Sequence, residues 1–228
     1  MVTRIHFTRE LQRLQDEMIM LGSMVAEAIQ DAVRSLRERD LETAKRLIKY
    51  DRTLNARRFE IERDTLVLLA TQQPMAGDLR LLAAILEIST ELERMGDYAK
   101  GIARITLMLG LEPMVKPTPE IQVMADRGTD MMRRALDAFV NRDLEAAKAI
   151  PLEDDEIDAM YNKVNRELVT TMMAHPDRSD QANYMSWAAH NLERFADRVT
   201  NICERIMYTI TGEFMEFDAE EPGMSGIH

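Results

Sequence analysis

The sequence is poor in the residues that interrupt helices and in those that are typical of sheets. Its 228 residues include only 9 glycines and 7 prolines, and aromatic side chains make up 5% of the chain. Sandwiches and barrels normally use more turn residues and more aromatics than this. Most of the chain consists instead of Ala, Leu, Ile, Met, Glu, Asp and Arg, which are mostly helix formers. The composition therefore predicts an all-α protein.

Three further absences indicate the cellular compartment of the protein. The single cysteine, Cys203, excludes an internal disulfide and is typical of a reducing environment. The first ten residues carry charges and no apolar segment, which argues against a signal peptide. The longest uncharged run, residues 65–77, is too short to cross a bilayer. From these absences we expect a soluble cytoplasmic protein.

Positive charge is scarce relative to negative charge. Lys and Arg number 29 against 40 Asp and Glu, which gives a formal net charge of −11. Non-specific binding to nucleic acid depends on clustered cations, so we expect no nucleic-acid partner. The acidic excess favours instead cations, basic protein surfaces or simple solubility.

The chain repeats itself. Residues 39–45 (RDLETAK) recur at 142–148 (RDLEAAK), and residues 92–97 (LERMGD) recur at 192–197 (LERFAD). Between these two matches, residues 51–55 align with residues 154–158, and a proline occurs in each copy. The offset drifts only from 103 to 100 residues, so two halves of about one hundred residues share one plan.

Apolar spacing and helix-breaking residues divide each half into three long helices. Asp40 and Asp78 are predicted N-caps of the second and third, and Pro74 ends the second. The six helices span, approximately, residues 8–38, 41–70, 78–109, 120–140, 144–174 and 179–210.

Long helices with short turns predict two tandem three-helix bundles. We place the first bundle at residues 1–112 and the second at residues 118–212. Residues 113–117 are predicted to be a linker between them. An acidic tail, residues 213–228, has no assigned role.

Carboxylates interrupt an apolar stripe. Glu93 and Asp97 are spaced i,i+4 and so share one helix face. A step of 100° per residue puts them on the line of Leu79, Leu82 and Leu86, so the stripe that should continue into the core becomes acidic. Like charges at this spacing repel each other, and burying them unpaired costs several kcal/mol each.

The same arrangement recurs in the second half. Glu193 and Asp197 repeat the pair on the last predicted helix. A neighbouring helix in each half carries a further i,i+4 pair of oxygen ligands: Asp51 with Asn55, and Asp154 with Asp158. Two facing pairs would supply about four oxygen side chains per half, a shell that suits divalent cations or oxo-bridged iron.

We therefore predict two metal sites, one in each half. Two alternatives stay open. The carboxylates could form a structural salt-bridge network, for instance with Arg94 neutralising Glu93, or they could bind basic residues of a partner protein. Recurrence in both halves favours metal.

Catalytic motifs are missing. Ferritin-like di-iron sites need Glu-x-x-His on two helices, and no histidine of this chain follows a Glu by three. His190 precedes Glu193 by three in one half only, where it could be an extra ligand. Cys203 has no recurring His partner, and there is no Gly-rich phosphate loop and no His-Glu-x-x-His. We expect no enzyme activity.

These residues resemble the PhoU phosphate-signalling family. The resemblance rests on the doubled Leu-Glu-Arg-x-x-Asp motif at 92–97 and 192–197, with Pro74-x-x-x-Asp78 upstream and the acidic run 154–158. It implies two similar three-helix bundles that bind multinuclear iron, or other metals such as zinc. The implied ligands are Asp51, Asn55, Glu93 and Asp97 in one cluster and Asp154, Asp158, Glu193 and Asp197 in the other, with Asp155 as a possible extra. Asn55 replaces a carboxylate of the family pattern, which weakens the first site.

The resemblance also implies a role. Proteins of this family are non-enzymatic adaptors between the ATPase of the phosphate ABC importer and a phosphate-sensing membrane histidine kinase. They keep the phosphate-starvation regulon off and restrain uptake when phosphate is plentiful. A homodimer that reaches the membrane only through its partners is the expected form. The alternative is a metal-buffering or di-metal helical bundle that is not linked to phosphate control.

Overall fold

The computed structural model describes residues 2–112 and 118–213, with side chains from residue 5 onward. All regular secondary structure in these residues is helical, as the composition predicted. The elements are α1 (Val2–Glu38), α2 (Leu41–Gln72), α3 (Ala76–Leu109), α4 (Glu120–Asn141), α5 (Leu144–Ala149), η1 (Ile150–Glu153), α6 (Asp154–Ala174), η2 (Pro176–Arg178) and α7 (Ser179–Thr211). The predicted linker and, apart from residue 213, the predicted tail lie outside the described residues.

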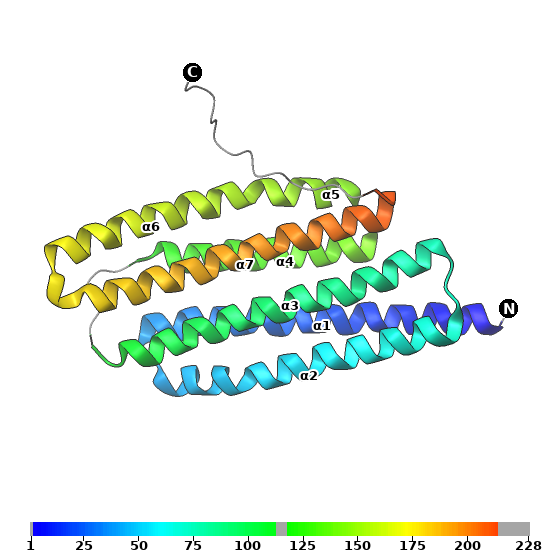
Figure 1. Ribbon diagram of the computed structural model, residues 1–228, viewed down its shortest axis with the longest axis horizontal. Helices are drawn as coiled ribbons and strands as arrows, with labels where there is room; N and C mark the ends of the chain where they lie inside the picture. The colour runs from blue at the N-terminus through cyan, green and yellow to red at the C-terminus, as the bar shows by residue number, and fades with distance from the viewer. Residues whose placement is uncertain (1, 113–117, 214–228) are drawn as a thin grey trace, which may run out of the picture.

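The helices form two layers, and each layer is one bundle (Figure 1). α1, α2 and α3 pack against one another in the first layer, and α4, α6 and α7 in the second. The two layers meet where α3 runs along α7 and α1 along α4. Their buried apolar side chains form one continuous cluster. The prediction of two tandem three-helix bundles is confirmed, and in the described residues no helix is long and apolar enough to span a membrane.

Equivalent residues of the two repeats meet at the interface. The Nε of Arg198 donates to the hydroxyl of Tyr98 at 3.2 Å, and these two residues are equivalent at an offset of 100. Asn201 Nδ2 donates to Glu91 Oε2 at 3.3 Å, and the equivalent pair on the other side, Gly101 with Asn191, is also in contact. If each residue is replaced by its equivalent in the other repeat, these contacts map onto one another, so a pseudo-twofold axis relates the two bundles. α3 accordingly runs antiparallel to α7 (Figure 1).

Of the two predicted N-caps, the structure confirms one and contradicts the other. The carboxylate of Asp40 accepts from the backbone N–H of Glu42 and Thr43 at 3.1 and 3.0 Å, which confirms it as the N-cap of α2. Asp143 caps α5 in the same manner. The prediction of Asp78 as a cap is wrong, because α3 begins after Met75 and places Asp78 in its first turn. A carboxylate there still complements the helix dipole.

The predicted helix over residues 144–174 is interrupted. It consists of α5, the 3₁₀ turn η1 and α6. Pro151 explains the break, because proline has no N–H to donate and its ring clashes with the carbonyl four residues earlier. The interruption makes Asp154 the first residue of α6.

Candidate functional site

The eight predicted ligands lie on two pairs of adjacent helices. We call the four residues of the first bundle the first set and those of the second bundle the second set. α2 packs along α3, and α6 along α7, so each set draws its members from two neighbouring helices. The first set is Asp51 and Asn55 on α2 with Glu93 and Asp97 on α3, and the second set is Asp154 and Asp158 on α6 with Glu193 and Asp197 on α7.

A lysine bridges the first set. Lys100 Nζ lies 2.7 Å from Asp51 Oδ2 on α2 and 3.4 Å from Asp97 Oδ1 on its own helix. Asp51 is 8% exposed, so water screens its charge only weakly and the ammonium of Lys100 provides the counter-charge. The hydrogen bond from Lys100 to Asp51 raises the pKa of the lysine, although burial of the ammonium opposes this. The contact holds α2 and α3 together at this level.

The other two members of the first set are an amide, Asn55, and a half-buried carboxylate, Glu93. Asn55 Nδ2 donates to the backbone carbonyl of Asp51 at 3.2 Å, one turn earlier on the same helix. The pKa of Glu93 is raised, first by burial and then by the negative charges of Asp97 and Asp51, while the guanidinium of Arg58 opposes the rise. The first set thus has cations from both helices beside it.

The second set consists of four half-buried carboxylates. Burial raises the pKa of Asp154 to about 7, and the charges of Asp158, Asp197 and Glu193 add to the rise. Burial likewise raises the pKa of Glu193 to about 7, with Asp197 and Asp158 contributing. The pKa of Asp158 is also raised, again by burial first. Burial and the neighbouring negative charges therefore disfavour the ionised forms of Asp154, Asp158 and Glu193 together.

Two buried oxygens of the second set lack a hydrogen-bond partner. They are Oδ1 of Asp154 and Oε2 of Glu193. His190 Nδ1 lies 3.3 Å from that Glu193 oxygen without forming a hydrogen bond. Arg194 donates to Asp197 at 2.7 Å, but within the described residues no Lys or Arg bonds to Asp154 or Glu193. Buried carboxylate oxygens without a donor are unfavourable, so this set is suited to take up a cation.

No ion could be enclosed by either set without a rearrangement. In the part of the chain that the structure describes, no group of three or more His, Cys, Asp or Glu side chains is arranged to hold a metal ion. Carboxylate side chains of the second set would have to change rotamer to converge on one point. Their chemistry fits hard and borderline cations, and the two unpartnered oxygens supply a reason for the change.

The acidic pair of α3 lies at the edge of the core rather than within it. Leu82 is fully buried, but Leu79, on the same line of the helix, is 49% exposed. Asp97 is exposed and Glu93 half-buried. The expectation that the pair continues a fully buried stripe is therefore wrong, because the line follows the boundary between the buried and solvent-facing sides of α3.

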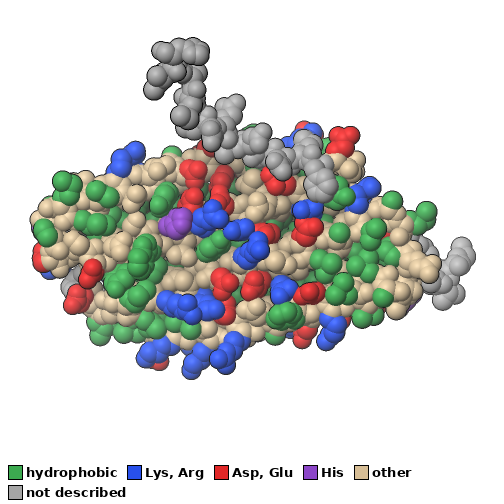
Figure 2. Space-filling view, in the orientation of Figure 1, with side chains coloured by type: hydrophobic (Ala, Val, Ile, Leu, Met, Phe, Trp, Pro, Cys, Tyr) green, Lys and Arg blue, Asp and Glu red, His purple; other side chains and the backbone are tan. Residues whose placement is uncertain are grey.

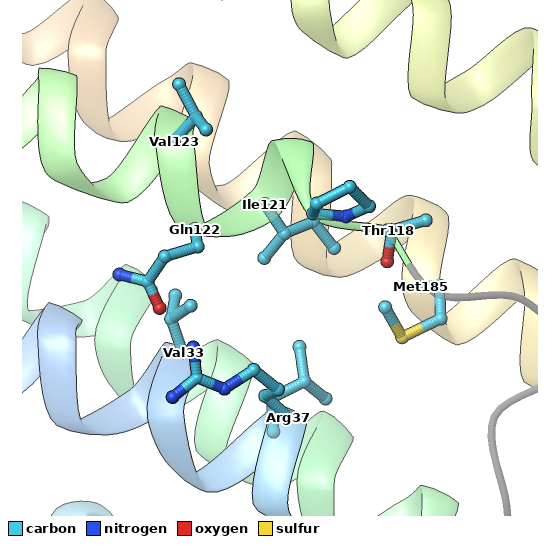
Figure 3. Close-up of a pocket in the computed structure, with 9 residues that line it drawn as sticks. Val33, Arg37, Thr118, Ile121, Gln122, Val123 and Met185 are labelled. Carbon is cyan, nitrogen blue, oxygen red and sulfur yellow. The ribbon is translucent and has the colours of Figure 1, made fainter.

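Two hollows of the surface lie apart from the sets. A groove of about 500 Å³ between α3 and α7 contains Glu87, Glu91 and Arg205, on a face where acidic and basic side chains intermingle (Figure 2). A mostly apolar cavity of about 460 Å³ lies between α1, α4 and α7, where Ile121 and Gln122 face Val33 and Arg37 (Figure 3). Among the described residues no carboxylate lines this second cavity, so it is not a candidate cation site.

The sequence analysis did not predict Lys100 and Arg58 as cations of the first set. Lys100 follows Asp97 by three residues, which places both on one helix face, and alignment of the repeats puts Thr200 at the equivalent position. The same alignment pairs Arg58 with Tyr161. The difference in charge between the aligned positions of the two repeats is the sequence signal that indicates Lys100 and Arg58.

Both halves of the chain match the same family model. That model, described as the PhoU domain, matches residues 19–106 and 121–206. Proteins named "Phosphate-specific transport system accessory protein PhoU homolog" are 34% identical in Clostridium acetobutylicum, over 95% of this chain and 100% of that protein, and 36% identical in Caulobacter vibrioides, over 95% and 94%.

Two solved structures share the fold. The crystal structure of the phosphate transport system regulatory protein PhoU from Streptococcus pneumoniae superposes with a TM-score of 0.84 at 31% identity, over 92% of this chain and 99% of that one. The crystal structure of PhoU from Pseudomonas aeruginosa superposes with a TM-score of 0.85 at 31% identity, over 91% and 100%.

Proposed function

Because the chain belongs to the PhoU family, we propose that it is a negative regulator of phosphate signalling and uptake. Family membership makes it an accessory protein of phosphate transport, as its relatives are named. The observation that carries the proposal is the match of both bundles to the PhoU domain, together with identities above 30% over nearly the whole chain. The finer role is that of an adaptor in the cytoplasm.

The adaptor would connect the ATPase of the phosphate importer to a phosphate-sensing histidine kinase. Long helical faces carrying mixed charge support this role, because α3 and α7 present Lys, Arg, Asp and Glu side by side over one side of the molecule (Figure 2). Charges on such a face can steer and orient a protein partner that carries the complementary pattern. A homodimer that contacts the membrane only through these partners is part of the proposal.

We further propose that the second set binds a metal, with iron the first candidate and zinc or another divalent ion as alternatives. Asp154, Asp158, Glu193 and Asp197 would hold it. The support is the pair of buried, unpartnered oxygens and the mutual repulsion of the four carboxylates. A bound cation would neutralise that charge and tie α6 to α7. The first set does not fit a cation in the same way, since Lys100 already bridges Asp51 and Asp97.

A phosphate-starvation reporter tests the regulatory role. In a strain that lacks the gene and grows in abundant phosphate, we expect alkaline phosphatase activity to switch on, and the wild-type gene to restore repression. The variant Glu193→Gln/Asp197→Asn, scored beside the exposed control Asp137→Asn, shows whether the second set contributes. A reporter that stays silent in the deletion strain contradicts the regulatory proposal.

The unpartnered oxygens of the second set favour one alternative, a metal-buffering bundle without a role in phosphate control. The same strain separates the two functions. A silent reporter combined with altered cellular metal content or metal sensitivity would support buffering.

A further inference from the structure

We propose that Lys100 is a built-in cation of the first bundle, whose ammonium takes the place between α2 and α3 that a metal ion would otherwise occupy. The first set then holds no metal, and the two bundles of one chain are unequal in metal binding. The contrast with the second bundle rests on the metal binding proposed above for the second set, whereas the assignment of Lys100 rests on the geometry of the first.

The contacts of Lys100 are those expected of a bridging cation. Its Nζ lies 2.7 Å from Asp51 Oδ2 and 3.4 Å from Asp97 Oδ1, so it joins predicted ligands from both helices. A lysine ammonium is a compact charge with three donors. A divalent ion would need the same oxygens at about 2.0–2.6 Å, and its charge would repel the ammonium from them.

The surroundings of Lys100 lower the negative charge that a metal ion would meet. The first set has three carboxylates, because Asn55 takes the fourth position, and its amide already bonds to the backbone of α2. The positive charge of Arg58 also acts on Glu93, although its guanidinium pairs with Glu62 at 2.5 Å. The Lys100 ammonium beside three carboxylates leaves less attraction for a divalent ion than four carboxylates would offer.

The second bundle differs at each of these positions. The repeat alignment puts Thr200 at the position of Lys100, Tyr161 at that of Arg58 and Asp158 at that of Asn55. The hydroxyl of Thr200 is buried without a hydrogen-bond partner, as are one oxygen each of Asp154 and Glu193. Three substitutions between the repeats thus separate a set whose two helices are bridged by a lysine from one that, within the described residues, has no such bridge, although Arg194 pairs with Asp197 at 2.7 Å.

An exchange of residues between the repeats tests the proposal on the full-length protein. The chain is stripped with a chelator and titrated with Mn²⁺, and bound Mn²⁺ is measured by equilibrium dialysis and electron paramagnetic resonance. Lys100→Thr with Asn55→Asp gives the first set the residues of the second. We expect this variant to bind at least one Mn²⁺ per chain more than the wild type.

A matched control separates the loss of a cation at this place from a general change in charge. Lys163 pairs with Glu120 at 2.7 Å, outside both sets, so Lys163→Thr removes a paired lysine without opening either set. This control should keep the wild-type Mn²⁺ content. An equal gain in the control and in the Lys100 variant would overturn the proposal, and so would no gain in a Lys100 variant whose circular dichroism shows a folded protein.

Two further variants decide the matter if the first exchange prevents folding. Thr200→Lys with Asp158→Asn gives the second set a bridging lysine. We expect this variant to lose the Mn²⁺ that the wild type binds, and retention of that Mn²⁺ would overturn the proposal.

Glu93→Gln/Asp97→Asn removes two carboxylates of the first set and should leave the Mn²⁺ content of the wild type unchanged. A loss of Mn²⁺ would show that the first set does bind metal. If the wild type binds no Mn²⁺ at all, metal binding by the second set fails, while a gain on the Lys100 exchange still supports the role of Lys100.

Discussion

Individual side chains of the two sets differ in how their charge is compensated. Asp51 is nearly inaccessible to solvent, and Lys100 provides its counter-charge. Asp154 has no such partner, and burial raises its pKa to about 7. A proton on Asp154 relieves the cost of burying its charge beside Asp158, Asp197 and Glu193. Stability at the residue scale should therefore depend on pH.

Asp154→Asn should stabilise the metal-free protein above pH 7. The folded-state pKa of Asp154 exceeds its ordinary value of 3.8, so the stability linked to its proton is complete below pH 4 and is lost as the pH rises to about 7. Since Asp154 is only half-buried, solvent screening reduces the loss to about 1 kcal/mol, or about 2–4 °C in Tm. Thermal unfolding at pH 5 and pH 8, with chelator present, measures it.

The control for this change is Asp137→Asn, which removes an exposed carboxylate on α4. Its pH dependence should follow that of the wild type. If Asp154→Asn also follows the wild type, Asp154 does not hold a proton in the folded state.

At the scale of elements, the positions of the sets depend on where helices begin and how they pair. Pro151 ends α5 and makes Asp154 the first residue of α6, at the end of the helix where backbone N–H groups favour negative charge. α3 is the central element of the first bundle, because it packs on α1 and α2 and also on α7 of the other bundle. Its polar contacts with α7 should therefore contribute to stability.

Removal of Glu91 should weaken the contact between α3 and α7. Glu91 Oε2 accepts from Arg198 and Asn201 at 3.3 Å each, and its side chain is 15% exposed. Glu91→Ala leaves the guanidinium of Arg198 without a carboxylate and should lower the free energy of unfolding by about 1–3 kcal/mol. Urea unfolding of Glu91→Ala, Arg198→Ala and the double variant isolates the coupling between the two residues.

Glu87→Ala is the matched comparison on the same face. Glu87 pairs with Arg205 but is 47% exposed, so its removal should cost less than about 1 kcal/mol. Equal losses for Glu87→Ala and Glu91→Ala would show that burial at the bundle interface does not set the strength of these pairs.

The whole molecule is a pseudo-symmetric pair of bundles with one continuous apolar core. α1 approaches α4 closely at Gly22, where a Cβ would lie 2.2 Å from Leu136 Cδ1. Gln30 on α1 donates to Thr129 on α4 at 3.1 Å and accepts from Gln122 at 3.0 Å. These contacts and the packing of α3 on α7 join the bundles independently of the connecting segment.

Cutting the chain between the bundles should leave them together. With a specific protease site inserted at residues 113–117, the cleaved protein should elute in size-exclusion chromatography at the position of the intact one, because separation would expose the apolar faces of α1, α3, α4 and α7. The uncut insertion variant serves as the control. Two species of half the mass would show that the interface cannot hold without the covalent connection.

The helical class, the repeat and the pairing of carboxylates along each helix could all be predicted from the amino-acid sequence. These features depend on local propensity and on spacing along one element, and the caps at Asp40 and Asp143 follow from the same local chemistry. The prediction failed at Pro151 and Asp78, where the local signal was misread.

How the negative charge of each set is compensated depends instead on the packing of the helices. Lys100 meets Asp51 because α2 and α3 lie side by side in one register, and spacing within α3 contains no information about a residue on α2. The same holds for the buried oxygens of Asp154 and Glu193, whose solvation depends on how α6 packs against α7. Two copies of one motif, equal in spacing, therefore differ in charge balance because the side chains that face them come from other helices or from positions outside the motif.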